Sequence, residues 1–184
     1  MSDQKIADVA EPGYGFVAKF LHWLIFALMV TQYSVAFLMP HIGGPKTQLV
    51  DLIAWHFSLG TTILFFAVLR LVWRVTHPVP LLTTIPVWQQ RLARAVHDLI
   101  YVFLIALPVL GWIAAGNRGW DVRLFGVFTL PQLGPTGARW AHTAGDVHVV
   151  LSYAFMGVLA LHIVGALYHY FIMRDRVLQR MLAG

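Results

Sequence analysis

Histidines inside apolar stretches are the residues of this chain with the clearest chemical potential. Nine histidines occur among 184 residues, and four of them lie within long uncharged segments or at their first turn. These four are His22, His56, His148 and His162. An ionisable side chain is costly inside a bilayer, so its presence there indicates a functional site. Imidazole is a common ligand of iron, zinc, copper and nickel, and the four histidines therefore predict a metal or haem site within a membrane.

The composition supports a membrane location for these histidines. Hydrophobic residues make up 59% of the chain and charged residues only 11%, whereas soluble domains carry about 25% charged residues. A membrane-spanning helix needs about 20 mostly apolar residues. Four segments meet or approach this length: 20–39, 52–69, 99–115 and 147–173. We therefore predict an all-α, integral membrane four-helix bundle, a single domain over residues 1–184 with helices at about 18–39, 49–73, 92–115 and 145–173.

The distribution of positive charge predicts how the bundle is oriented. Nine basic residues lie before the first helix, between the second and third, or after the fourth: Lys5, Lys19, Arg70, Arg74, Arg91, Arg94, Arg174, Arg176 and Arg180. The other two connections carry only Lys46, Arg118, Arg123 and Arg139. The positive-inside rule then places both termini in the cytoplasm. Because the net charge of +5 follows membrane topology in this way, it does not indicate a nucleic-acid partner.

Helix direction groups the four histidines into two pairs. His148 and His162 are fourteen residues apart, which is about 21 Å along one helix and nearly the same helical face. With the N-terminus inside, His22 lies near the cytoplasmic end and His56 near the outer surface. The expected pairs are His56 with His148 at the outer level and His22 with His162 at the inner level. Two imidazoles on opposite sides of a flat macrocycle would need this arrangement, so we predict two b-type haems.

Two alternatives to haem remain open at this point. Each histidine could be a hydrogen-bonded structural residue. The chain could also be a non-haem metal transporter, but such a site normally adds carboxylates or sulfurs, and none of the eight acidic residues lies deep in a predicted helix. The chain has no cysteine, which excludes disulfides, iron–sulfur clusters and covalent Cys-x-x-Cys-His haem attachment.

Other polar residues near the helix ends have less specific roles. His97 opens the third helix and His169 follows His162 by seven residues; each could be an alternative ligand, a proton donor at a quinone site or an interfacial residue. Arg70 and Arg74, one turn apart, could pair haem propionates or only determine topology. The remaining histidines His41, His77 and His142 are expected in solvated loops. The longest connection, 116–145, mixes aromatic residues with glycine and proline and is expected to cap the bundle.

Several motifs in order along the chain resemble one family. They are Leu21-His22-Trp23-Leu24, His56-Phe57-Ser58-Leu59-Gly60, the Arg70 to Arg74 pair followed by Pro78, His97 with Leu104-Ile105-Ala106-Leu107-Pro108 and Gly111, Asn117-Arg118-Gly119, the step from His148 to His162, and His169 to Phe171 with Arg174-Asp175 before Arg180-Met181-Leu182. Together these motifs resemble the bacterial cytochrome b561 family, in particular its small four-helix dihaem proteins such as superoxide oxidase. The likeness covers nearly the whole chain.

The resemblance implies a multi-pass protein of the bacterial inner membrane. It carries the haem ligands over to the same four histidines, and it implies electron exchange with ubiquinone. Superoxide is then the expected donor and the chain an oxidoreductase, with Lys46, Arg118, Arg123 and Arg139 as a positive rim that attracts the anion. His97 and His169 would help to supply protons to the quinone. One departure is Val149, where the family can have an acidic residue.

A rival function within the same family also stays open. A cytochrome b subunit could link a periplasmic dehydrogenase or hydrogenase to the quinone pool. The outer loops would then form a docking surface for that partner, and the chain would not react with superoxide.

Overall fold

A computed structural model describes residues 13–39, 49–79 and 85–182 of the chain. Its main elements are four helices: α1 Phe16–Leu38, α2 Leu49–Thr76, α3 Val87–Asn117 and α4 Arg139–Tyr168. All four are long and apolar enough to cross a membrane, which confirms the predicted helical bundle. We call the end that carries Leu38, Asn117 and Arg139 the outer end, and the end that carries Phe16, Thr76 and Tyr168 the inner end. The expected outer turn at residues 40–49, with Lys46 and His41, lies almost wholly outside the described residues.

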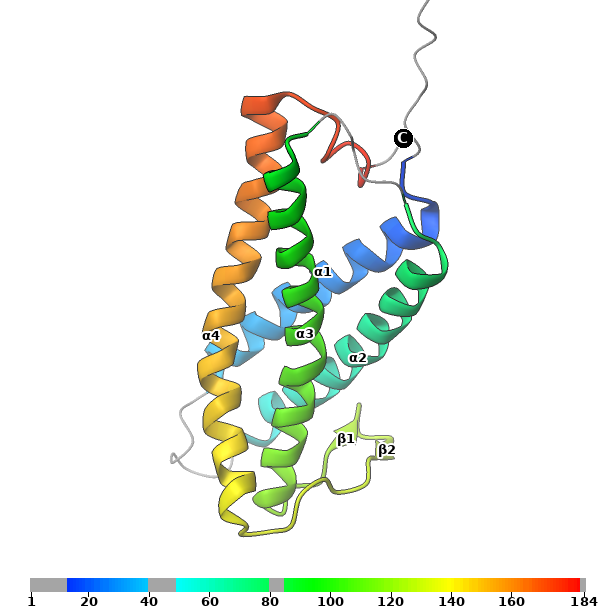
Figure 1. The fold of residues 1–184 in the computed structure, drawn as a ribbon. Helices are drawn as coiled ribbons and strands as arrows, with labels where there is room; N and C mark the ends of the chain where they lie inside the picture. The colour runs from blue at the N-terminus through cyan, green and yellow to red at the C-terminus, as the bar shows by residue number, and fades with distance from the viewer. Residues whose placement is uncertain (1–12, 40–48, 80–84, 183–184) are drawn as a thin grey trace, which may run out of the picture.

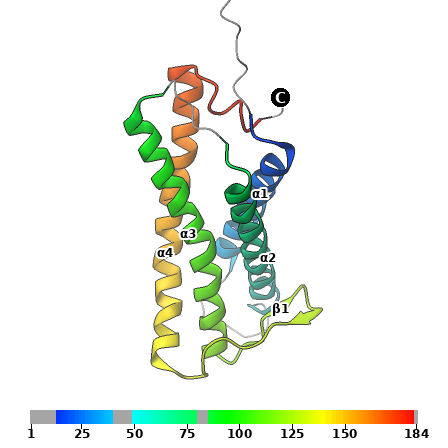
Figure 2. The same cartoon turned by 45° about the vertical axis from the view of Figure 1, so that its right-hand side comes forward.

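The helices are arranged as two crossing pairs. Helix α1 packs along α2, α3 packs along α4, and α2 joins the pairs through contacts with α3. Figures 1 and 2 show the α1–α2 pair crossing beside the α3–α4 pair. The buried core lies in the middle of the bundle and includes Ile63, Ala67, Phe103 and Phe155. Phe155 is only 1% exposed and lies seven residues from both His148 and His162, so packed side chains separate the two histidine levels.

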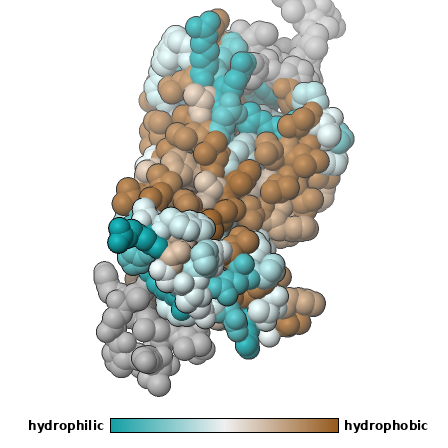
Figure 3. All heavy atoms as spheres, turned by 60° about the horizontal axis from the view of Figure 1, so that its bottom comes forward, coloured by the Kyte–Doolittle hydropathy of each residue, from teal (hydrophilic) through white to brown (hydrophobic). Residues whose placement is uncertain are grey.

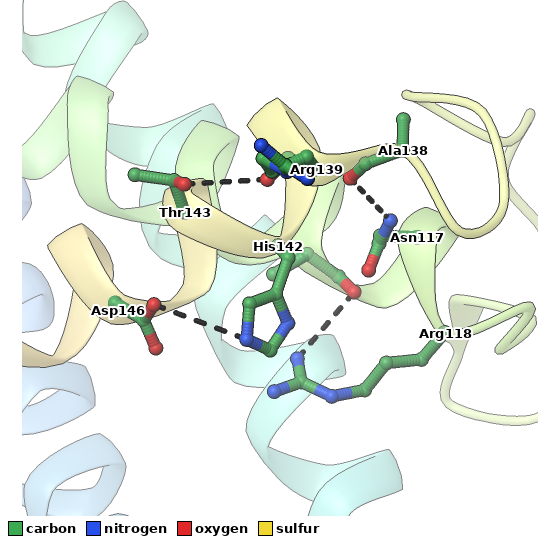
Figure 4. Close-up of polar contacts among 8 residues, drawn as sticks. Asn117, Arg118, Ala138, Arg139, His142, Thr143 and Asp146 are labelled. Atoms are coloured by element: carbon green, nitrogen blue, oxygen red, sulfur yellow. Dashed lines mark hydrogen bonds and ion pairs between the residues drawn. The ribbon is translucent and has the colours of Figure 1, made fainter.

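Two helices begin earlier than the sequence predicts. Helix α3 begins at Val87, directly after Pro86, because proline has a fixed φ and no N–H and is well tolerated at the start of a helix. Helix α4 begins at Arg139, where the Asn117 side chain donates to the carbonyl oxygen of Ala138 at 2.9 Å (Figure 4). The prediction of His142 in a loop is therefore wrong, because it lies in the first turn of α4.

The connection between α3 and α4 folds over the outer end, as predicted. It contains a small hairpin of strands β1 Arg123–Leu124 and β2 Phe128–Thr129, which the sequence did not reveal. The backbone of β1 is bound to α2 through Ser58, whose hydroxyl donates to the Arg123 carbonyl oxygen at 3.1 Å. Further along, the Trp112 indole donates to the carbonyl oxygen of Pro131 at 3.0 Å. The connection is thus held on two helices at once.

At the inner end, the chain turns back across the bundle after α4. A short π-helix, η1 His169–Met173, extends α4 to the predicted end of the fourth helix. Arg174 then adopts a left-handed conformation with φ 53° and reverses the chain direction. The returning segment reaches α1, where the Trp23 indole donates to the carbonyl oxygen of Met181 at 2.9 Å. Figure 1 shows this segment crossing from α4 toward α1.

The flanks of the helices are largely exposed and apolar. In α4, only 6% of the most apolar window is buried inside the protein. Figure 3, viewed toward the outer end, shows apolar side chains along the flanks and hydrophilic ones toward the ends. Exposed apolar surface of this extent fits a lipid environment.

Candidate functional site

The outer histidine pair joins α2 and α4. The ring centroids of His56 and His148 lie 6.0 Å apart with an interplanar angle of 77°. Nδ1 of His148 is 2.9 Å from the carbonyl oxygen of Leu107, which can only accept. His148 therefore donates from Nδ1 and keeps a lone pair on Nε2, the arrangement that metal-ligating histidines commonly use.

Close contacts set the position of both outer rings. A Cβ atom at Gly111 would lie 3.2 Å from Cε1 of His148, so only glycine leaves the ring its full space. Across the pair, the Gln32 amide donates to the His56 carbonyl oxygen at 3.2 Å and lies 3.1 Å from Nδ1 of its ring. Gln32 and the steric role of Gly111 were not predicted from the sequence. A polar residue within the apolar run 20–39 was the available signal for Gln32.

A cavity of about 300 Å³ lies at the level of the outer pair. Its lining comes from all four helices and from the connection between α3 and α4, and it includes both histidine rings. Among the described residues that line it, Arg118 is the one with a permanent charge. The Arg118 guanidinium lies over the Trp120 ring at 5.3 Å from its centroid, which holds this charge at the edge of the cavity.

The inner histidine pair joins α1 and α4 in a more strongly charged setting. The ring centroids of His22 and His162 lie 6.2 Å apart with an interplanar angle of 68°. Arg70 approaches the pair, with Nη2 at 3.3 Å from Nδ1 of His22, and it donates from Nη1 to the Tyr101 hydroxyl at 2.5 Å. The His97 ring lies 5.1 Å from the His162 ring, so the structure brings His97 to the inner pair.

Arg70 and Arg74 have different partners. Arg74 forms an exposed ion pair with Asp98 at 3.5 Å. No ion pair of Arg70 with an acidic side chain occurs in the described part of the chain, and its buried Nε has no hydrogen-bond partner there. An uncompensated guanidinium in a membrane interior is costly. Of the two arginines, Arg70 is therefore the better placed to receive a carboxylate.

His169 lies at the inner edge of the bundle and has a carboxylate partner. Its Nδ1 is 2.5 Å from Oδ2 of Asp175, and both side chains are mostly buried. The other oxygen of Asp175 accepts from the backbone N–H of Val177 at 3.0 Å. Asp175 therefore fixes the His169 ring from one side, a contact that the sequence analysis did not foresee.

The four rim residues predicted from sequence do not share one setting. Arg118 reaches the cavity, whereas Arg123 forms an ion pair with Asp121 at 3.2 Å. Arg139 is exposed at the first residue of α4, and Lys46 lies outside the described residues. Figure 4 shows Arg118 and Arg139 at the junction of α3 and α4.

The spacing of both histidine pairs fits an iron between two imidazoles. Metal–imidazole bonds are about 2 Å long, so two rings on opposite sides of one metal have centroids roughly 6 Å apart. Both observed spacings agree with this value. Within the described ranges, no group of three or more histidine or acidic side chains could hold a bare metal ion. The donor set therefore suits haem better than an isolated cation.

Comparison with known proteins supports the same chemistry. The family model described as prokaryotic cytochrome b561 matches residues 13–184. The chain belongs to this family. Membership implies haem b binding and membrane electron transfer, and it removes the metal-transporter alternative.

Three relatives illustrate the range of the cytochrome b561 family around this chain. Cytochrome b561 homolog 2 of Escherichia coli (strain K12) is 29% identical over 92% of this chain and 90% of its own. The probable superoxide oxidase CybB of Yersinia pestis is 28% identical over 88% of this chain and 91% of its own. Cytochrome b562 of Cereibacter sphaeroides is 28% identical over 94% of this chain and 96% of its own. These similarities extend across nearly the full length of each relative.

Proposed function

We propose that this cytochrome b561-family chain is a dihaem protein that transfers electrons from superoxide to ubiquinone. The observation that carries the proposal is the presence of two histidine pairs at two depths, each with the ring spacing that a shared iron requires. The full-length similarity to a probable superoxide oxidase supports the choice of donor.

In this proposal, His56 and His148 hold the outer haem, and His22 and His162 hold the inner one. Two haems with paired imidazole ligands would supply one-electron carriers without an open coordination position. The Leu107 carbonyl keeps His148 in the ligating tautomer, and Gln32 steadies His56 from α1. Arg70, with its unpaired Nε, would receive a propionate at the inner level.

Arg118 gives the outer site its preference for an anion. Its guanidinium is the permanent charge at the cavity edge, and a positive charge at a cleft raises the local concentration of a small anion. Two superoxide ions would each lose one electron and become dioxygen. Those two electrons, with two protons, reduce one ubiquinone to ubiquinol.

The inner end carries the groups that could supply these protons. His169 is held by Asp175 at the inner edge, and His97 lies against His162 deeper in the bundle. Each of the two side chains offers an imidazole nitrogen that could pass a proton to a bound quinone. We propose that ubiquinone is reduced near this end, with His169 as the proton donor closer to the aqueous side.

The first experiment counts haems in histidine variants. We expect two haems b per chain from reduced-minus-oxidised spectra and pyridine haemochrome quantitation. His56→Ala and His162→Ala should each remove one, with different losses in the alpha band. His142→Ala is the matched control, because this histidine is exposed in the first turn of α4 and should leave both haems. Loss of the same haem in both variants would refute the pairing.

The second experiment separates superoxide from a partner protein as the donor. Superoxide is mixed rapidly with the oxidised, purified protein in the presence of a ubiquinone analogue. We expect haem reduction followed by quinol formation at one quinol for every two superoxide ions. If neither occurs, while haem reduction follows addition of a co-purifying dehydrogenase or hydrogenase, the superoxide assignment is wrong and the rival cytochrome-subunit function holds.

A further inference from the structure

The hairpin between α3 and α4 ends in an exposed apolar tip. Phe125, Val127 and Phe128 are 52%, 73% and 66% exposed, and residues 124–130 contain no charge. Three large apolar side chains at an exposed turn are costly to leave in water. Their exposure therefore calls for a partner outside the chain.

The backbone of the tip is strained at Phe125, which has a positive φ. Phe125 has φ 47° and Gly126 φ 73°, and the Val127 N–H donates to the Leu124 carbonyl oxygen at 3.0 Å. This is a tight turn that normally favours asparagine or glycine at the first of these positions, because a bulky residue with positive φ is strained. An outlier of this kind suggests that the ring itself has a use.

The hairpin is held firmly beside α2. The Phe125 N–H donates to the hydroxyl of Ser58 at 2.9 Å, and the same hydroxyl donates to the Arg123 carbonyl oxygen. The Phe125 ring meets the Trp55 ring edge to face at 5.9 Å. At the base of the hairpin, the Leu130 N–H donates to the Val122 carbonyl oxygen at 2.8 Å. The tip therefore has a defined position relative to the membrane-spanning helix.

The attachment point lies close to the edge of the membrane. The apolar span of α2 covers 25 residues, Leu52–Thr76. At 1.5 Å per residue this is about 37 Å, longer than the roughly 30 Å of a bilayer's hydrocarbon core. Ser58 lies six residues into that span, about 9 Å from its outer end. With the span centred in the bilayer, its outer end extends about 4 Å beyond the hydrocarbon core, so Ser58 lies about 5 Å inside the boundary between headgroups and acyl chains. The hairpin attached to Ser58 is therefore close to this boundary.

We infer that the tip formed by Phe125, Val127 and Phe128 inserts into the outer-end interface of the bilayer and anchors the connection on lipid. The tip continues the exposed apolar flank of α2, where Trp55 is 54% and Phe65 58% exposed. Its base carries the Asp121–Arg123 ion pair, which suits the aqueous side. Three side chains are also far too small for a stable protein interface, which needs about 1,000 Å².

Anchoring the tip has a consequence for the outer cavity. The residues directly before the hairpin, Arg118, Trp120 and Val122, line that cavity. The Trp120 ring lies 6.3 Å from the Phe57 ring, next to His56 in α2. A tip fixed in lipid would hold this edge of the cavity against α2. The inference does not depend on the identity of the electron donor.

The chain has no cysteine, so single labels test the depth of the tip directly. Phe128→Cys and, in a separate protein, Val127→Cys receive a nitroxide spin label in the full-length protein in phospholipid nanodiscs. Phe65→Cys on the flank of α2 is the lipid reference, and Arg139→Cys at the exposed start of α4 is the water reference. Collision of the label with oxygen and with a water-soluble nickel complex measures its surroundings.

We expect both tip labels to collide with oxygen several-fold more often, relative to the nickel complex, than the Arg139 label does. Their ratios should lie between those of the two references, since the tip is at the interface. Haem content equal to that of the unlabelled protein shows that each variant is folded, and two separate tip positions guard against failure of one. Tip labels as accessible to the nickel complex as the Arg139 label would overturn the inference. In that case a protein partner becomes the candidate occupant.

Discussion

The outer and inner histidine pairs have nearly the same ring spacing but very different surroundings. The outer rings are held by neutral groups, the Leu107 carbonyl and the Gln32 amide, and by the space that Gly111 leaves. The inner rings have a buried guanidinium, Arg70, and a third imidazole, His97, beside them. Histidine pairs with the same ring spacing can therefore lie in two different electrostatic environments within one bundle.

This difference suggests a direction for electron transfer. A positive charge near a redox centre stabilises its reduced form, because reduction adds negative charge. Arg70 lies at the inner pair, whereas Arg118 lies at the cavity edge over Trp120. We therefore expect the inner centre to have the higher potential, which favours transfer from the outer level to the inner one.

The substitution with the largest expected effect acts sterically and concerns only the outer histidine pair. Gly111→Leu should remove the outer haem and leave the inner one, because even a Cβ would press on the His148 ring. The measurement is haem per chain and the alpha-band spectrum. Gly157→Leu on α4 is the matched control, since nothing lies within 4 Å of a Cβ there. Retention of both haems in Gly111→Leu would show that the His148 ring can move from its present position without loss of haem.

A charge substitution tests the inner environment. Arg70→Gln should lower the midpoint potential of one haem by on the order of 60 mV, equivalent to about tenfold in an equilibrium constant. Potentiometric titration measures both centres in one sample. Arg74→Gln should shift either potential much less, because Arg74 is exposed and paired with Asp98. Equal shifts in the two variants would contradict a special role for the buried guanidinium.

A second charge substitution tests the outer environment. Arg118→Gln should slow haem reduction by superoxide several-fold and weaken its dependence on ionic strength, since the permanent charge at the cavity edge is lost. Stopped-flow absorbance at several salt concentrations gives both quantities. Arg123→Gln serves for comparison, because Asp121 already balances that charge. If the two substitutions slow the reaction equally, superoxide is attracted by the overall positive charge of the outer end and not specifically by Arg118.

The smallest expected effect concerns proton supply at the inner end. Asp175→Asn should slow ubiquinone reduction a few-fold while leaving haem reduction by superoxide unchanged, because the His169 ring loses its charged partner. Steady-state quinol formation and single-turnover haem reduction distinguish the two steps. Asp121→Asn at the outer end should leave quinone turnover unaltered. A loss of haem reduction in Asp175→Asn would instead indicate a general structural defect.

Sequence alone was sufficient for the framework of the site. Hydropathy located the four spans, and the rise of an α-helix placed His148 and His162 at two levels, because both depend only on order along one chain. Helix direction then predicted which rings would meet, and the structure brings His56 to His148 and His22 to His162. The start of α4 was misjudged because Asn117 and Ala138, which define it, meet only after folding.

Tertiary structure alone decided what surrounds each histidine pair. Gln32 on α1 reaches His56 on α2, Tyr101 on α3 binds Arg70 on α2, and the apolar tip is positioned through Ser58. These contacts join residues far apart in the sequence, and no local periodicity reports them. Hydropathy and the rise of the α-helix thus determined the depths of the four imidazoles, whereas the way the helices cross decided which of them meets a neutral amide and which a buried charge.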